Sequence, residues 1–249
     1  MKTWVCMAVC WLLAGVSRSA GAYRPFEGTD AETAEPNEVE LEVGPVEFVS
    51  APAAPQLVIP AVIFNYGIAR NFELVVEGRH ELQFNSRPLG PKSRIVSSAF
   101  SVKEVLREGG LQGHTGLSIA NEWSILLPDT GTHQRWGAET TTIFSSRWRL
   151  MTLHINVINE ISTQRRYVSS VGPIIEGPFS WRIRPVMEVV LAREFGAARL
   201  NRGLFGSVLL GTIGRASDSL SLDFAVLYTR FQSAREEAMR VGFTWSFAP

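Results

Sequence analysis

Cysteine is almost absent from this chain of 249 residues, whose only two cysteines are Cys6 and Cys10. Both lie in a segment that begins with a positive Lys2, continues with an apolar stretch over 5–16 and ends in small residues at 20–22, the pattern of a cleaved signal peptide. A membrane anchor is the alternative, but about a dozen apolar residues fall short of the ~20 that span a bilayer as a helix. Removal of the peptide leaves no thiol, which excludes disulfides and cysteine metal sites.

The chain also has no net charge and no long apolar helix. Its formal charge is +0, and loss of the signal peptide makes it faintly acidic, without a stripe of lysine and arginine. Nucleic acid is therefore not an expected partner. The stretch 50–69 carries no charge and is long enough for a membrane helix, but Pro52, Pro55 and Pro60 would break that helix. We interpret it as a loop followed by a strand.

No sustained helical period occurs, and extended segments separated by clusters of turn residues repeat to the end of the chain. A short helix over 101–109 is the one local alternative, because Val102, Val105 and Leu106 would share a side. Twelve strands are predicted, an even number, as in single-chain bacterial barrels. The predicted segments are 37–48, 56–66, 70–84, 94–107, 114–127, 135–147, 150–163, 167–177, 181–195, 203–214, 218–231 and 236–247.

The last of these segments shows the clearest alternation. Bulky apolar residues occupy every second position from Met239 to Phe247, and small or polar residues occupy the positions between them. A strand places successive side chains on opposite faces, so this period of two separates an apolar stripe from a polar one. Large aromatics near strand ends are typical of the membrane interface of outer-membrane barrels. The expected interface aromatics are Trp181, Tyr228, Phe243, Trp245 and Phe247.

Alternation alone does not separate a membrane barrel from a soluble sandwich, since both divide apolar from polar faces. The signal peptide and the aromatic-rich apolar faces favour an all-β, transmembrane antiparallel β-barrel of about 12 strands over residues 37–249. It follows the signal peptide (1–22) and a flexible acidic N-terminal arm (23–36). This predicts an outer-membrane location with both termini in the periplasm. The expected partners are the lipid bilayer, the barrel-assembly machinery and a small-molecule solute. A secreted lipocalin-like binding protein is the main alternative.

Charged residues on the polar faces are the expected lumen lining. Salt bridges among them could fill a closed lumen, and twelve strands lie between the filled eight-stranded barrels and the open porins. Open and closed lumens both remain compatible with the sequence, and mixed signs argue against strong ion selectivity. The candidates are Glu77, Arg79, Glu81, Lys103, Glu122, Glu139, His154, Glu160, Arg182, Arg184, Glu188, Asp223 and Arg240.

Catalytic and metal chemistry has little support in the sequence. The four histidines are scattered with no metal-ligand spacing, which predicts no metal and no cofactor. His154 is expected in the lumen beside Asn156 and Glu160, where a nucleophilic serine would make it a base for a lipid-modifying enzyme. No Gly-x-Ser-x-Gly elbow occurs, and the glycines of 109–113 lack the ending of a phosphate loop. The sequence therefore predicts a non-enzymatic protein.

Three short stretches resemble a known family. They are the start, Gly28-Thr29-Asp30 with 35–44 (EPNEVELEVG), the later Leu126-Leu127-Pro128, and the close at 242–247 (GFTWSF). The pattern is similar to the transporter-like outer-membrane barrels named for the MetA pathway of phenol degradation. The resemblance implies a barrel of about twelve strands that passes small molecules. One departure is that Ala248 and Pro249 follow Phe247, whereas such barrels commonly finish on the aromatic residue.

Overall fold

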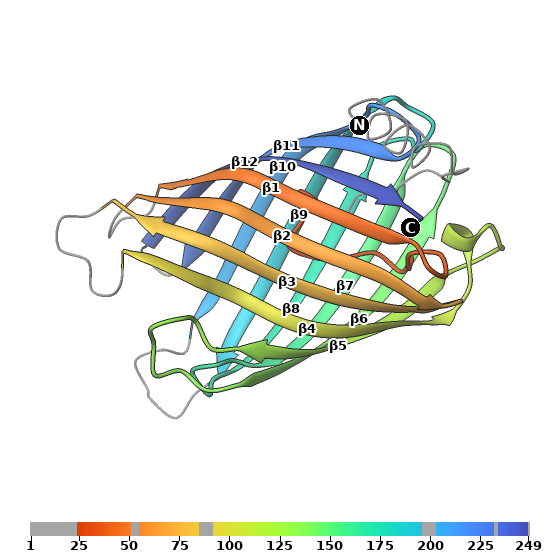
Figure 1. The fold of residues 1–249 in the computed structure, drawn as a ribbon. Helices are drawn as coiled ribbons and strands as arrows, with labels where there is room; N and C mark the ends of the chain where they lie inside the picture. Colours follow the sequence, from red (N-terminus) through yellow and green to blue (C-terminus); the bar gives the residue numbers. More distant parts are fainter. Residues whose placement is uncertain (1–23, 51–54, 85–91, 196–202, 232–233, 249) are drawn as a thin grey trace, which may run out of the picture.

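The computed structural model describes residues 24–50, 55–84, 92–195, 203–231 and 234–248, so the predicted signal peptide lies outside the described residues. Twelve antiparallel strands form one closed barrel (Figure 1). Each strand pairs with its neighbours in sequence, and β1 also pairs with β12 to close the ring. The strands are β1 (Val39–Ser50), β2 (Gln56–Ala69), β3 (Phe72–Gln83), β4 (Ser93–Arg107), β5 (Ser118–Leu127), β6 (Gly137–Arg147), β7 (Thr152–Ile161), β8 (Tyr167–Glu176), β9 (Ile183–Phe195), β10 (Leu204–Arg215), β11 (Leu220–Phe231) and β12 (Ala234–Phe247).

The predicted all-β barrel and its strand number are confirmed. The largest error is the start of the fifth strand, which begins at Ser118 rather than at 114. Gly113 and Gly116 there have φ angles of 80° and 93°, so the chain turns after a short 3-10 helix, η1 (Gly110–Gln112). The helix considered for 101–109 does not form, because β4 continues to Arg107. Within the described ranges, no helix is long and apolar enough to cross a membrane.

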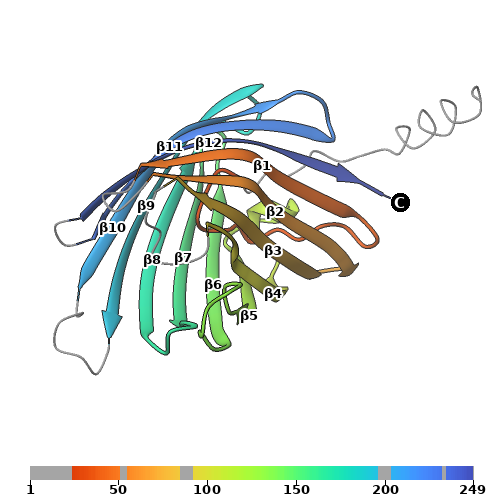
Figure 2. The ribbon, with the colours of Figure 1, turned by 60° about the vertical axis from the view of Figure 1, so that its left-hand side comes forward.

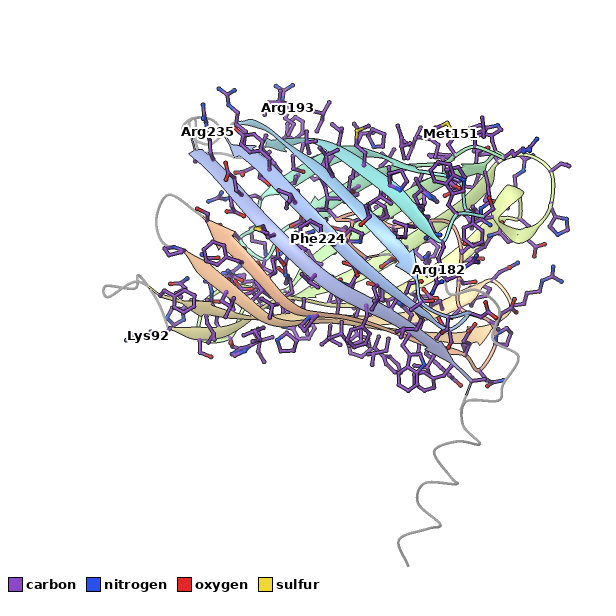
Figure 3. The ribbon with its side chains drawn as sticks, turned by 90° about the horizontal axis from the view of Figure 1, so that it is seen from above. Lys92, Met151, Arg182, Arg193, Phe224 and Arg235 are labelled. Carbon is purple, nitrogen blue, oxygen red and sulfur yellow. The ribbon has the colours of Figure 1, made fainter. Side chains whose placement is uncertain are left out.

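The outer surface of the barrel is apolar. Phe100, Leu210 and Phe224 are 54%, 56% and 43% exposed, and Phe224 lies on the outside of the ring of strands in Figure 3. A water-soluble barrel buries its apolar face, whereas this one presents that face outward, as membrane barrels do. The lipocalin-like alternative does not fit this surface. Among the expected interface aromatics, the rings of Trp245 and Phe247 lie 4.6 Å apart on the outer face.

Irregularities in two strands change which residues face inward. A bulge between Val43 and Val46 lets β1 place both Glu42 and Glu47 in the interior, although they are five residues apart. A second irregularity, where β3 meets β4, leaves Ser97 at a φ of 50°. A strict period of two therefore misplaces Glu47.

The segment before β1, the N-terminal arm of residues 24–36, runs irregularly through the interior of the barrel (Figures 1 and 2). Arg24 is 8% exposed and Ala31 is fully buried, although neither belongs to a strand. Backbone groups outside regular structure need other hydrogen-bond partners, and here the barrel wall supplies them. The arm therefore occupies the lumen, a position that the sequence did not specify.

Candidate functional site

The candidate site is the lumen together with the N-terminal arm. All but one of the predicted lumen residues lie on the inward face of their strands, including Lys103 and Glu188 at 1% exposed and His154 at 2%. Arg182 is the exception: it lies in the turn before β9, is exposed, and donates from its guanidinium to the carbonyl of Arg215. The prediction for Arg182 was wrong because the strand begins one residue later. Trp181 lies in the same turn and is 56% exposed.

The first group of contacts holds the beginning of the arm. The buried Glu42 carboxylate accepts the backbone N–H of Arg24 at 3.0 Å and the side-chain amide of Asn65 at 3.1 Å. The Arg24 guanidinium lies 3.6 Å from the Asp223 carboxylate. Burial lowers the pKa of the Arg24 guanidinium, and the neighbouring Asp223 partly offsets this effect. One arginine of the arm thus bridges carboxylates from β1 and β11.

A second group centres on Arg240 of β12. Its guanidinium donates to the Glu47 carboxylate at 2.9 Å and to the carbonyl of Pro25 at 3.1 Å, and it also pairs with Glu27 of the arm. Arg79 pairs with the same Glu47. The attraction of Arg240 lowers the pKa of Glu27. Arg240 therefore links Glu47 of the barrel wall to two residues of the arm, Pro25 and Glu27.

The third group is a backbone clamp. The Glu188 carboxylate accepts the N–H groups of Glu27 and Gly28, both at 2.8 Å. Asn156 accepts the N–H of Thr29 at 3.1 Å and donates to the carbonyl of the same residue at 2.9 Å. A Cβ at Gly28 would lie 3.0 Å from both Glu188 Oε1 and Asn156 Nδ2. Only glycine allows this close approach without displacing a side chain.

Lys103 forms the fourth group on the opposite wall. Its ammonium lies 3.8 Å from Asp30 and 3.9 Å from Glu73, and it donates to the Thr29 hydroxyl at 3.4 Å. Glu73 in turn accepts the N–H of Ala34 at 2.5 Å. A fully buried lysine would be costly alone, and here carboxylates from the arm and from β3 surround it.

The last group surrounds His154. The Ser145 hydroxyl lies 2.8 Å from His154 Nδ1, and His154 Nε2 lies 3.0 Å from the Glu176 carboxylate. Glu176 is also 2.7 Å from Arg184. Ser145, His154 and Glu176 thus form a hydrogen-bonded chain that matches the nucleophile, base and orienting carboxylate of a catalytic triad. The Ser145 hydroxyl is fully buried and accepts the N–H of Ala31 at 3.1 Å, so the group also anchors the arm.

Residues 31 and 32 of the arm, next to this group, make a further hydrogen bond and an ion pair. Glu32 lies 3.2 Å from Arg147, and the Gln112 amide donates to the carbonyl of Ala31 at 2.6 Å. Burial, reinforced by the nearby Asp30, raises the pKa of Glu32 to about 7, and Arg147 opposes that shift. Glu32 is therefore the arm residue that titrates near neutral pH.

Beside the arm the lumen keeps a cavity of about 260 Å³. Arg24 to Thr29 form one side, and inward residues of several strands form the other. Its carboxylates from the barrel wall are Glu42, Glu47, Glu73, Glu77, Glu122 and Glu139, and its basic residues from the wall are Arg79, Lys103 and Arg240. A cavity of this size holds several waters but no continuous wide pore. Among the described residues, no cluster of histidine and carboxylate side chains could hold a metal ion.

Several important residues were missed from the sequence. Glu73 follows the alternation of β3 and could have been added to the lumen candidates. Glu47 is hidden by the bulge in β1, and the arm residues Arg24 and Asp30 show no periodic signal at all. Their inward position results from tertiary hydrogen bonds that no local pattern encodes.

The fold and the site together define a closed twelve-strand barrel with an apolar exterior and an interior that holds its own N-terminal arm and a cavity beside it. No protein-family model matches the chain, and no curated protein matches it. Among solved structures, it is similar to the COG4313 outer membrane channel from Pseudomonas putida F1, with a TM-score of 0.64, 8% identity, and coverage of 89% of this chain and 100% of that one. It is also similar to the KdgM porin, with a TM-score of 0.53, 9% identity, and coverage of 84% of this chain and 99% of that one. At these identities the likeness concerns the fold.

Proposed function

We propose that the protein is an outer-membrane channel for small polar molecules, and that its N-terminal arm controls the width of the lumen. The observation that carries this proposal is the arrangement of a charged, cavity-bearing interior inside a closed ring with a lipid-type exterior. The solved structures of similar fold are named as a channel and a porin, which supports the same class. The mixed signs of the lining agree with weak ion selectivity.

The arm is the part of the channel that must move for a larger solute to pass. It is held by hydrogen bonds and ion pairs rather than by a large apolar core, so water and solute can replace its contacts one by one. Each bond to a charged group contributes ~1.5–3 kcal/mol, so the arm can be released in several moderate steps rather than in one large step. An arm held in this way is suited to reversible release.

The family assignment belongs to the same proposal. The motifs at 28–30, 35–44 and 242–247 support membership of the transporter-like barrels named for the MetA pathway of phenol degradation. Insertion by the barrel-assembly machinery follows from the aromatic end of β12, and export would use the signal peptide of residues 1–22.

Planar-bilayer conductance tests the function. The full chain is compared with a variant that lacks residues 24–36 and with the double variant Glu188→Gln/Asn156→Ala, which keeps the arm but removes its backbone clamp. We expect low conductance from the full chain and a clear rise in both variants. A heat-shift gel confirms that each variant forms a barrel. The proposal fails if correctly folded variants conduct no more than an empty bilayer.

A second candidate, an outer-membrane hydrolase, is favoured by the Ser145–His154–Glu176 group alone. It requires that the hydroxyl reach a substrate, whereas Ser145 is now covered by Ala31 and faces the lumen rather than the lipid. Labelling with a fluorophosphonate, with Ser145→Ala as control, tests it. This candidate is removed if neither the full chain nor the arm deletion shows labelling that depends on Ser145.

A further inference from the structure

The cavity beside the N-terminal arm carries an excess of negative charge. Seven carboxylates line it, against four basic side chains. The basic side chains are those of Arg24, Arg79, Lys103 and Arg240. Each of the four lies within ion-pair distance of a carboxylate. Within the described ranges, by contrast, no ion pair includes Glu77, Glu122 or Glu139, which are three carboxylates of the cavity wall.

The nearest basic groups are already engaged by other carboxylates. Arg79 is two residues beyond Glu77 on the inward face of β3, but its guanidinium pairs with Glu47. Lys103 is the direct cross-strand partner of Glu122, but its ammonium lies between one carboxylate of the arm and one of β3. The charges of Glu77 and Glu122 therefore remain in excess on this side of the cavity.

A fourth carboxylate extends the acidic side toward one end of the barrel. Glu160 of β7 is the direct cross-strand partner of Glu139 of β6, and both face the lumen. Like charges directly opposite each other on a sheet are destabilising, and a cation beside them would relieve that repulsion. Glu139 lies near the start of β6 and Glu160 near the end of β7, at the end of the barrel away from Val39 and Phe247. The acidic surface therefore leads from that end to the cavity.

Another part of the cavity wall is apolar. Ala61 of β2, Val75 of β3 and Phe26 of the arm all line the cavity. Phe26 also packs against a buried apolar cluster that includes Ala61. A metal ion would gain nothing from this surface, whereas the hydrocarbon part of an organic cation would be desolvated on it. The cavity of about 260 Å³ has room for a short chain of this kind, since one water occupies only ~30 Å³.

We propose that the cavity binds small aliphatic polyamines, with their ammonium groups on Glu77, Glu122 and Glu139 and their methylene groups on the apolar wall. Rings of acidic side chains favour cations in other channels, and charge-assisted hydrogen bonds to carboxylates are the strong ones. The inference rests on the proposed channel function and names the solute class of that channel. It also gives the weak ion selectivity of the lining a sign, in favour of cations.

The test measures binding to the full chain in non-ionic detergent by isothermal titration calorimetry at pH 8. The probes are putrescine and succinate, which are ions of opposite charge and similar length, and butanediol, which is the neutral analogue of putrescine. The test variant is Glu122→Gln/Glu139→Gln. The matched control is Glu104→Gln/Glu237→Gln, which removes two carboxylates that do not line the cavity. A heat-shift gel verifies folding of every variant.

We expect putrescine to bind at least about tenfold more tightly than butanediol, and succinate to bind most weakly. The test variant should lose most of this preference, and the control should stay within about twofold of the parent chain. Equal binding of the three probes, or an equal loss in the test and control variants, would overturn the proposal. If the test variant does not fold, Glu77→Gln replaces it, and unchanged putrescine binding by that variant has the same consequence.

Conductance separates this inference from the function on which it rests. Putrescine binding by a chain that does not conduct in a planar bilayer would support the polyamine site and remove only the channel function. A conducting barrel to which putrescine does not bind would leave the channel function in place and overturn the polyamine site.

Discussion

Replacing Glu188 by glutamine should release the N-terminal arm from the lumen. The Glu188 carboxylate is 1% exposed and accepts two backbone N–H groups of the arm, at 2.8 Å each. Glutamine keeps one acceptor oxygen, but its amide places N–H groups where the second backbone donor points. The substitution hardly changes volume, so the barrel wall should keep its packing. The change therefore acts on the arm rather than on the strand.

The magnitude follows from the bonds that are lost. A hydrogen bond to a charged group contributes ~1.5–3 kcal/mol, and an unsatisfied buried donor adds a penalty of ~1–3 kcal/mol. We expect the docked arm to lose ~2–4 kcal/mol, which is a factor of roughly 30 to 1,000 in the docking equilibrium. Glu194→Gln is the matched control, because Glu194 lies inward on the same strand but pairs with Arg166 rather than with the arm.

The assay uses the lack of cysteine beyond residue 22. Ala31→Cys introduces a single thiol at an arm position that is 0% exposed when the arm is docked. Its labelling by a polar maleimide reports the population of released arm when docking is fast relative to labelling. Glu188→Gln should accelerate labelling by more than tenfold, and Glu194→Gln should leave it unchanged. Equal labelling rates in the two variants would refute the assignment of Glu188 as a clamp of the arm.

Three further predictions concern the arm and the barrel. Because burial raises the pKa of Glu32 to about 7, its contribution to arm docking is complete below its ordinary pKa of 4.5 and is lost as the pH rises through 7. Single-channel conductance should therefore increase from pH 5 to pH 8, and Glu32→Gln should flatten that slope; a slope that persists in the variant would contradict the assignment. Gly28→Ala should raise conductance a few-fold at constant pH, since its Cβ would press on Glu188 and Asn156; unchanged conductance would mean that the clamp adapts. The folded chain should migrate faster before boiling than after on a gel, and a product soluble without detergent would exclude the membrane barrel.

The barrel could be predicted from the sequence because its signal is local. Alternation such as Leu222, Phe224 and Val226 against Ser221, Asp223 and Ala225 determines the two faces of one strand without reference to any other strand. Glycines and prolines mark the turns between these segments, and counting the segments gives the number of strands. Predicted strand boundaries were wrong where the geometry of a turn sets the start of a strand, as at Gly113 and Gly116 before β5. The same locality explains the error at Arg182, which alternates correctly but precedes the first paired residue of β9.

The contents of the lumen could be predicted only in part. Inward charges such as Lys103 and Arg240 follow from alternation, but their partners do not, because Asp30 and Glu27 belong to an aperiodic segment. The contacts join residues more than 70 positions apart, and no period relates them. The Ser145–His154 pair also could not be predicted from the sequence, since it depends on the register between β6 and β7.

The chemistry of the arm explains how one segment can both fill a barrel and leave it. An apolar plug would exclude water, and its binding free energy would come from buried apolar surface area. Its release would therefore expose all of that apolar surface in one costly step. The arm instead carries Arg24, Glu27 and Asp30, each of which meets an opposite charge on the wall, and Glu32, whose carboxyl group lies beside Arg147. When the arm leaves, those wall charges are not stranded in a dry core, because water enters the widened lumen and solvates them. The polar interior thus lowers the cost of both states, which is the property that a closable channel requires.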